Sequence, residues 1–158
     1  MVNGARMHGI MHPEMGHLHV PHDMQADPFP GLCPPHSDCL EGLASGPALE
    51  KRWGKPGEDL PEDLPAWELE AHYLALGLVN ILGVLSPQSF VLGGGVMEQS
   101  HLLPLIRKNV KQPLNNYLQH PAVLEQIGDS IVLPQLGQKA GVFGALALAQ
   151  VTDPTRAK

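Results

Sequence analysis

Two short apolar runs, each set between stretches of helical periodicity, constrain the fold of this chain more than any other feature. They are Ser-Phe-Val-Leu at residues 89–92 and Ser-Ile-Val-Leu at residues 130–133. The flanking apolar patterns predict helices over residues 40–53, 65–85, 100–118 and 140–150. Alternation of helices with short, wholly apolar strands is typical of α/β folds whose strands are buried on both faces. We therefore expect an α/β fold, with the small residues of the last helix allowing close packing.

Glycine and proline mark where these helices should end or bend. Gly54 is expected to end the first helix, and Pro65 suits the first turn of the second. Pro104 is expected in the first turn of the third helix, and Pro113 is expected to kink it, because proline lacks the N–H that a helix interior needs.

The first 40 residues differ in character from the rest of the chain. They are rich in Gly, Pro and His and show no sustained periodicity, so we expect an irregular segment held together by ligands. Residues 41–150 should form the α/β part, and residues 151–158 a tail. These are the three parts that the sequence predicts.

Charge and composition argue against several classes of protein. The net charge is −6, no block of Lys and Arg occurs, and aromatic residues make up 4% of the chain, which argues against a nucleic-acid surface. The longest apolar stretch, Leu74 to Leu85, is shorter than the roughly 20 residues that cross a bilayer. No signal peptide is recognisable at the N-terminus, and the two cysteines make no disulfide framework. We expect a cytoplasmic protein.

Three potential metal ligands follow one another at intervals of three residues in Cys33-Pro-Pro-His36-Ser-Asp-Cys39. Thiolate and imidazole are the donors that tetrahedral zinc prefers, and structural sites often take several ligands from one loop. Six histidines lie in the first 36 residues, and we choose His17 as the fourth ligand because Gly16 lets the backbone turn sharply before it. A Cys33–Cys39 disulfide, or two unrelated buried thiols beside a loose histidine, would be the alternatives.

Two carboxylates flank the expected zinc loop. Glu14 precedes His17 by three residues, and Glu41 follows Cys39 by two. Paired carboxylates beside a rigid loop suit hydrogen bonds to vicinal hydroxyls, such as those of a sugar, and a metal-bound imidazole has a second nitrogen to offer. Spacing alone, however, favours the simpler interpretation of two solvated surface acids.

Gly93, Gly94 and Gly95 follow the first expected strand and precede a helix. Glycines in this position let a backbone approach a flat or anionic ligand, and ligands of α/β sheets gather at the carboxyl ends of strands. The run lacks the Gly-Lys-Ser/Thr of a P-loop and does not match G-x-G-x-x-G. Without further evidence a simple tight turn is the favoured interpretation.

Taken together, the motifs resemble those of the ROK family, which comprises sugar kinases and sugar-responsive repressors. The motifs are H-P-E-M-G-H (12–17), C-P-P-H-S-D-C-L-E-G-L-A-S-G (33–46), V-L-G-G-G-V (91–96) and A-G-V-F-G-A (140–145). The resemblance implies an actin-like, ribonuclease-H-like ATPase fold with a zinc-bound loop. Many members carry C-x-C-G-x-x-G-C, whereas C-P-P-H-S-D-C resembles the fructokinase branch.

The resemblance also implies roles for individual residues. It assigns structural Zn²⁺ to His17, Cys33, His36 and Cys39, the sugar hydroxyls to Glu14, His17 and Glu41, and the adenosine part of Mg²⁺-ATP to Gly93, Gly94 and Gly95. The implied activity is ATP-dependent phosphorylation of a hexose, with fructose as the substrate, fructose 6-phosphate as the product, and a homodimer as the full-length form.

Two motifs of the family's kinases do not occur here. These kinases begin with a D-x-G-G-T phosphate loop and carry a later Asn-Asp whose aspartate is the general base. We therefore expect this chain to be the C-terminal lobe alone, with the N-terminal lobe and the base outside it and no activity of its own.

Two other functions remain open at this point. A sugar-sensing repressor would share this half but would add a helix-turn-helix, and the acidic charge gives that interpretation no support. A zinc-stabilised sugar-binding module without catalysis is the third interpretation.

Overall fold

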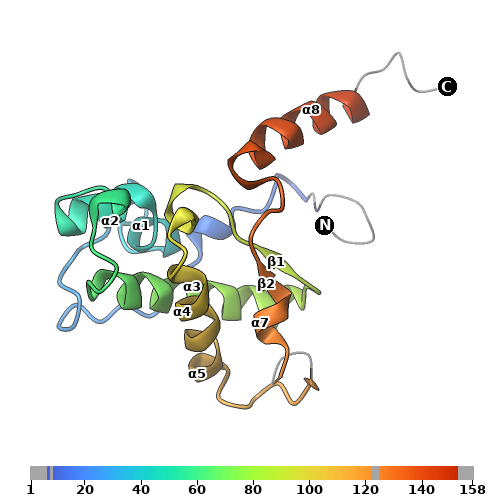
Figure 1. The fold of residues 1–158 in the computed structure, drawn as a ribbon. Helices are drawn as coiled ribbons and strands as arrows, with labels where there is room; N and C mark the ends of the chain where they lie inside the picture. The colour runs from blue at the N-terminus through green and yellow to red at the C-terminus, as the bar shows by residue number, and fades with distance from the viewer. Residues whose placement is uncertain (1–6, 8, 122–124, 153–158) are drawn as a thin grey trace.

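The computed structural model describes residue 7 and residues 9–121 and 125–152, which form a mixed helical and β structure (Figure 1). The elements in chain order are η1 (Met15–His17), α1 (Leu40–Leu43), α2 (Gly46–Trp53), η2 (Gly57–Asp59), α3 (Ala66–Leu85), β1 (Phe90–Val91), η3 (Gly95–Glu98), α4 (Leu102–Asn109), α5 (Lys111–Leu114), α7 (Ile127–Ser130), β2 (Ile131–Val132), η4 (Gly137–Lys139) and α8 (Ala140–Thr152).

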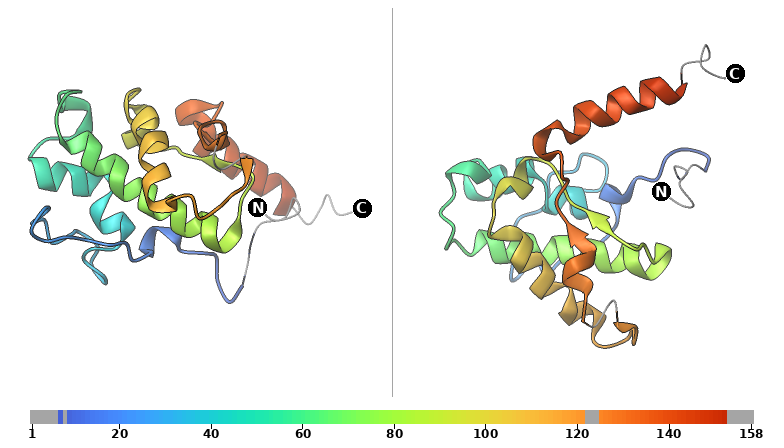
Figure 2. Two further views of the ribbon diagram at one scale, coloured as in Figure 1. Left: turned by 90° about the horizontal axis from the view of Figure 1, so that it is seen from below. Right: turned by 45° about the vertical axis from the view of Figure 1, so that its right-hand side comes forward.

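Helix α3 is the centre of the fold. In the left view of Figure 2, the N-terminal segment and α1 lie on one side of α3, and α4 with the strands lies on the other. A small core of Val20, Leu43 and Tyr73 fills the first side. A larger core that includes Leu102, Ile106 and Ile131 fills the second. Because both sides are covered, α3 is apolar around most of its circumference.

By length and composition alone, α3 is also long and apolar enough to cross a membrane. The core helix of a soluble protein meets the same two criteria. The helix spans 20 residues and is therefore longer than the apolar stretch Leu74–Leu85 within it. Packing of α3 against α1, α2 and α4 buries apolar residues such as Trp67, Leu78 and Leu82, whereas Val84 near its end is 82% exposed.

The two strands pair in parallel, with Phe90 opposite Ile131 and Val91 opposite Val132. A further hydrogen bond from the Leu92 N–H to the Val132 carbonyl (2.8 Å) extends the pairing by one step. Only one face is buried, since Ile131 is inaccessible whereas Val91 is 62% exposed. The expectation of strands buried on both faces is therefore wrong for the described residues, because no helix among them covers the second face.

The expected helix over residues 40–53 is two helices. Ser45 interrupts it and accepts a hydrogen bond from the Ala48 N–H (3.3 Å), so that a new helix begins at Gly46. Gly54 ends this helix in the left-handed conformation, as expected. The expected helix over residues 100–118 also divides, into α4 and α5, and ends at Asn115 with φ 41°.

Two elements near the C-terminus differ from expectation. The four-residue helix α7 directly precedes β2 and was not predicted, because residues 127–130 carry too few apolar positions to show a period. Helix α8 projects from the rest of the described structure (Figure 1), and its apolar side chains are exposed rather than closely packed. These exposed side chains are Val142, Phe143, Leu146 and Leu148.

Glu70 is an acidic side chain inside the core. It lies on α3, is inaccessible to solvent, and neither carboxylate oxygen has a hydrogen-bond partner among the described residues. Burial raises the pKa of Glu70 from 4.5 to about 8, and the charge of Arg52 only partly opposes this. The carboxyl group is therefore mainly protonated at neutral pH.

This burial makes the stability of the fold depend on pH. In the folded chain Glu70 holds its proton to a higher pH than in the unfolded chain, so the free energy of unfolding falls as pH rises from about 5 to 8. We expect Glu70→Gln to remove most of this slope and to stabilise the fold at pH 8 by on the order of 3 kcal/mol. Urea unfolding at pH 5, 6, 7 and 8 measures the effect.

Glu68→Gln is the matched control, since Glu68 lies on the same helix with a side chain that is 52% exposed. Its hydrogen bond from Lys108 lowers the pKa of Glu68, so it does not titrate in this range. Equal slopes for the wild type and Glu70→Gln would contradict the prediction.

Candidate functional site

Four potential metal ligands meet at one point of the N-terminal segment. They are His17 from η1 and Cys33, His36 and Cys39 from the loop that leads into α1, and their ligand atoms all lie within 4.8 Å of one another. The Cys33 sulfur lies 3.6 Å from His17 Nδ1 and 3.8 Å from His36 Nδ1, and the Cys39 sulfur lies 3.7 Å from His17 Nδ1. A zinc ion with ordinary bond lengths holds tetrahedral S and N ligands about 3.6 Å apart. The four residues therefore fit a tetrahedral metal ion.

Backbone hydrogen bonds fix the loop that carries three of these ligands. Cys33 and Ser37 exchange hydrogen bonds of 3.2 and 2.7 Å, and the Leu40 N–H donates to the Leu18 carbonyl at 2.8 Å. The loop is tight enough to need glycine at two places. A Cβ at Gly31 or Gly42 would lie 2.0 or 1.9 Å from the Ser37 carbonyl oxygen, a separation that no side chain tolerates.

Burial affects the acidity of the inner thiol. Cys39 is fully buried, and burial raises the pKa of the Cys39 thiol, with a further increase from the neighbouring Cys33. A hydrogen bond from the Gly42 backbone acts in the opposite direction. A divalent cation at the centre of the cluster would stabilise both thiolates, as metal sites with cysteine ligands require.

Glu41 lies against the cluster. Its carboxylate is 3.8 Å from Nε2 of His17, the ring nitrogen that does not face the sulfurs. A Cβ at Gly16 would lie 3.0 Å from this carboxylate, so glycine leaves room for it. Gly16 belongs to the short helix η1 and has no positive φ. The backbone does turn tightly here, because the His17 N–H donates to the Glu14 carbonyl (3.0 Å), but the turn needs no positive φ at Gly16, which instead leaves space for the Glu41 carboxylate.

Glu14 directly precedes η1 and pairs with His12, whose Nε2 lies 2.6 Å from the carboxylate. Glu14 therefore lies at the start of η1, and Glu41, from a later part of the chain, contacts its last residue, His17. Each acid has a histidine partner. About half of each side-chain surface remains exposed, so both acids are accessible to a ligand.

The three glycines after β1 form a turn with one residue in an unusual conformation. Gly94 has φ 100° and ψ 170°, which is open essentially only to glycine. Gly95 begins η3, and together with Val96 it lines a cavity of about 460 Å³. Gly93 and Gly94 are not among the residues that line this cavity, so only Gly95 of the expected three lies at its surface.

Sequence reasoning missed the opposite wall of this cavity. Gly46, Pro47 and Glu50 of α2 form one part of it, and Gly57 and Glu58 of η2 form another. The only sequence signal was the run Ser45-Gly46-Pro47 at the start of α2, which marks a helix start but does not indicate the glycine turn that faces it.

A buried ion pair was also missed. Asp27 and Arg52 lie 3.1 Å apart in the interior, and they are 25 residues apart in the sequence. No local sequence pattern connects two residues so far apart, so the pair can be recognised only in the folded structure.

The model of one protein family, described as the ROK family, matches residues 1–152 of this chain. The chain belongs to the ROK family. The ROK match includes the loop with the potential ligands Cys33, His36 and Cys39 (below, the metal loop), the acids Glu14 and Glu41, and the glycine turn at 93–95, and it confirms the family that the motifs indicated.

Several curated ROK relatives are named as fructokinases. A putative fructokinase of Bacillus subtilis is 44% identical over 149 residues, which are 94% of this chain and 50% of the relative. A fructokinase of Zymomonas mobilis is 43% identical, and the match covers 97% of this chain and 50% of the relative. A fructokinase of Pediococcus pentosaceus is 42% identical, with 90% and 48% covered. This ROK chain thus spans about half the length of these relatives.

Among solved structures, a ROK hexokinase from Thermus thermophilus matches with a TM-score of 0.63 and 23% identity. The match covers 87% of this chain and 47% of the hexokinase. It shows a shared fold over that part, and the hexokinase has an actin-like ATPase fold, as the resemblance implied.

Proposed function

We propose that this chain supplies the substrate-positioning part of an ATP-dependent fructokinase, which forms fructose 6-phosphate in the cytoplasm. The observation that carries the proposal is the four-ligand cluster with Glu41 in contact with the imidazole of His17. Relatives at 42–44% identity that are named as fructokinases support the same activity.

The metal in this proposal is a structural Zn²⁺ held by His17, Cys33, His36 and Cys39. The S–N separations of 3.6 to 3.8 Å and the soft donor set support zinc. Four protein ligands leave no open position for a substrate, so the ion contributes rigidity and not Lewis acidity. Its effect on the reaction would pass through the residues that the loop carries.

The sugar in this proposal is bound by Glu14, Glu41 and His17. Both carboxylates can accept two hydrogen bonds from neighbouring hydroxyls. Nε2 of a zinc-bound His17 carries a proton, so it can donate a hydrogen bond to Glu41 or to a sugar hydroxyl. These contacts would hold the ring so that its primary hydroxyl reaches the phosphate to be transferred.

The nucleotide in this proposal occupies the cavity at the glycine turn. Its volume of about 460 Å³ suits an adenosine group, and Gly95 presents bare backbone to it. Glu50, Glu58 and Glu98 line the cavity and offer acceptors for an amino group or ribose hydroxyls. Mg²⁺ bound to the β- and γ-phosphates would neutralise charge as it does in other kinases.

The chemical step needs few groups beyond those that position the substrates. The sugar hydroxyl oxygen bonds to the γ-phosphorus, the bond from this phosphorus to the β–γ bridging oxygen breaks, ADP leaves, and the hydroxyl proton passes to a base. This chain matches about half of each relative. We propose that the base and the phosphate loop belong to the other half of the enzyme.

A hybrid protein tests this function. The half of the Bacillus subtilis relative that this chain does not match is joined to residues 1–158, and ADP release is measured with fructose, glucose and mannose. We expect turnover with fructose to exceed turnover with the other sugars by about tenfold or more. Glu41→Gln should lower kcat/KM for fructose by about 100-fold, because a misplaced sugar reacts poorly.

Glu62→Gln is the matched control, since Glu62 is an exposed acid of the connector before α3 that lines none of the described cavities. A folded, zinc-loaded hybrid without fructose-dependent turnover would contradict the proposal. So would equal kinetics for Glu41→Gln and Glu62→Gln.

A further inference from the structure

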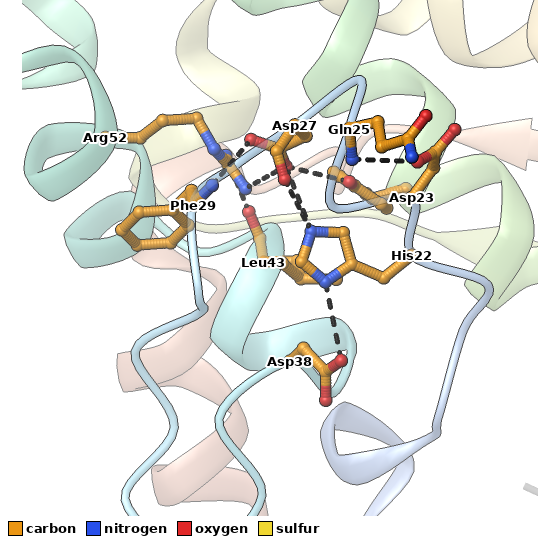
Figure 3. Close-up of polar contacts among 9 residues, drawn as sticks. His22, Asp23, Gln25, Asp27, Phe29, Asp38, Leu43 and Arg52 are labelled. Carbon is orange, nitrogen blue, oxygen red and sulfur yellow. Dashed lines mark hydrogen bonds and ion pairs between the residues drawn. The ribbon is translucent and has the colours of Figure 1, made fainter.

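A second polar cluster lies behind the metal loop, away from the groups used above. Figure 3 shows Asp27 between Arg52 and His22, with Asp38 on the far side of the imidazole. The side chains of His22, Asp27 and Arg52 are 3%, 4% and 6% exposed, so the cluster is part of the interior. Its residues come from the N-terminal segment, from the metal loop and from α2.

Asp27 is the fixed end of this cluster. Its Oδ2 accepts hydrogen bonds from the Tyr73 hydroxyl (2.8 Å) and from Arg52 Nη2 (3.1 Å), and its Oδ1 accepts one from the Phe29 N–H (3.4 Å). Arg52 also donates to the Leu43 carbonyl (2.9 Å) and lies 4.5 Å above the Phe29 ring. These contacts hold Asp27 against α2 and α3, and Arg52 connects it to α1.

His22 connects this fixed end to the metal loop. Its Nε2 donates to the Asp27 backbone carbonyl oxygen at 3.0 Å, and its Nδ1 lies 3.4 Å from Asp38 Oδ2, to which it donates when both ring nitrogens carry a proton. In the sequence, Asp38 lies between two of the proposed metal ligands, His36 and Cys39. The Asp38 side chain is 46% exposed, and His22 is its one partner among the hydrogen bonds and ion pairs of the described residues.

We propose that His22 is a positioning residue for the metal loop. Because His22 is held by Asp27 and contacts Asp38, it restrains the part of the loop that carries His36 and Cys39 in the geometry that the ion needs. His22 itself does not bind the ion. The inference rests on the proposed zinc site. Its physical basis is that contacts around a loop reduce the number of arrangements the loop adopts without metal. Removing a hydrogen-bond partner of a ligand typically lowers metal affinity by about 10- to 100-fold, and we expect the low end of this range because Asp38 is not itself a ligand.

The test is zinc affinity, measured on the full chain by competition with a chromogenic chelator at pH 7. We expect His22→Ala and Asp38→Ala each to weaken zinc binding by about tenfold or more. Because both variants remove the same contact between His22 and Asp38, the double variant should bind zinc no more weakly than whichever single variant binds it less tightly. A non-additive cycle of this kind is the signature of a direct interaction.

Two further variants keep the test decisive. His72→Ala removes a histidine that lines the same cavity as His22 but has no contact with Asp38, and its zinc affinity should stay within about twofold of the wild type. Asp38→Leu changes a half-exposed side chain and cannot bond to His22, so it tests the link even where His22→Ala fails to fold. Wild-type zinc affinity in Asp38→Leu and Asp38→Ala, or additive losses in the cycle, would overturn the inference. Absence of zinc from the wild type would instead refute the proposed metal site.

Discussion

Replacing Cys39 with alanine is expected to abolish zinc binding and to lower the free energy of unfolding by on the order of 10 kcal/mol. Cys39 is fully buried at the start of α1, and its sulfur lies 3.7 Å from His17 Nδ1. The wild type should hold one zinc ion per chain, by elemental analysis of protein purified without added metal. Since small domains have a total stability of about 5–15 kcal/mol, the variant should be largely unfolded in urea concentrations that leave the wild type intact.

His19→Ala is the matched control for Cys39→Ala. The His19 ring packs 5.5 Å from the ring of His36, yet His19 is outside the group of four ligands. It should therefore retain one zinc ion per chain. A Cys39→Ala variant that keeps its zinc, or a His19→Ala variant that loses as much, would contradict the ligand assignment.

Loss of the proposed zinc ion should also disturb the proposed sugar site. Glu41 follows Cys39 by two residues and contacts His17, so a disordered loop would displace the carboxylate. In the hybrid protein, Cys39→Ala should therefore weaken fructose binding together with metal retention, as titration calorimetry would show. Zinc loss with unchanged fructose affinity would separate the two sites.

The metal loop was predictable because its information is local. Three ligands lie within seven residues, and the chemistry of thiolate and imidazole limits what such a loop does. The structure places all four expected side chains together, while their binding of zinc stays a prediction. The role of Gly16 was not predictable, because the neighbouring carboxylate of Glu41 comes from 25 residues further along the chain.

The cluster around Asp27 shows the opposite case. Its partners Arg52 and Tyr73 lie 25 and 46 residues away in the sequence, and no periodicity or motif connects them. Similarly, the cavity at Gly95 needs the start of α2, which only the packing of α2 near η3 brings into place. Sequence patterns identify helices and short-range ligands, whereas such pairs arise only from tertiary packing.

The boundaries of the helices and strands were less predictable than their order. Ser45 could cap a new helix or continue the old one, and only its hydrogen bond to Ala48 decides this. The exposed faces of β1 and α8 could not be foreseen, since apolar residues such as Val91 and Phe143 favour burial on composition alone.

The 158-residue chain alone is expected to show no measurable sugar kinase activity. Three acids of the N-terminal part already have partners, since Glu14 pairs with His12, Glu41 contacts His17, and Asp27 is buried in an ion pair. General-base assistance alone contributes about 10² to 10⁴ in rate, and the loss of a phosphate loop adds to that deficit. A coupled assay of ADP release, with fructose, glucose and mannose at millimolar concentrations, measures this activity.

This assay, run on the zinc-loaded chain beside its Glu14→Gln variant, tests most directly whether residues 1–158 lack the groups that perform the chemical step. We predict the same background ADP release from both proteins, with no dependence on fructose. Fructose-dependent release by the wild type well above that of Glu14→Gln would contradict this prediction, because it would place the base for the sugar hydroxyl within these 158 residues.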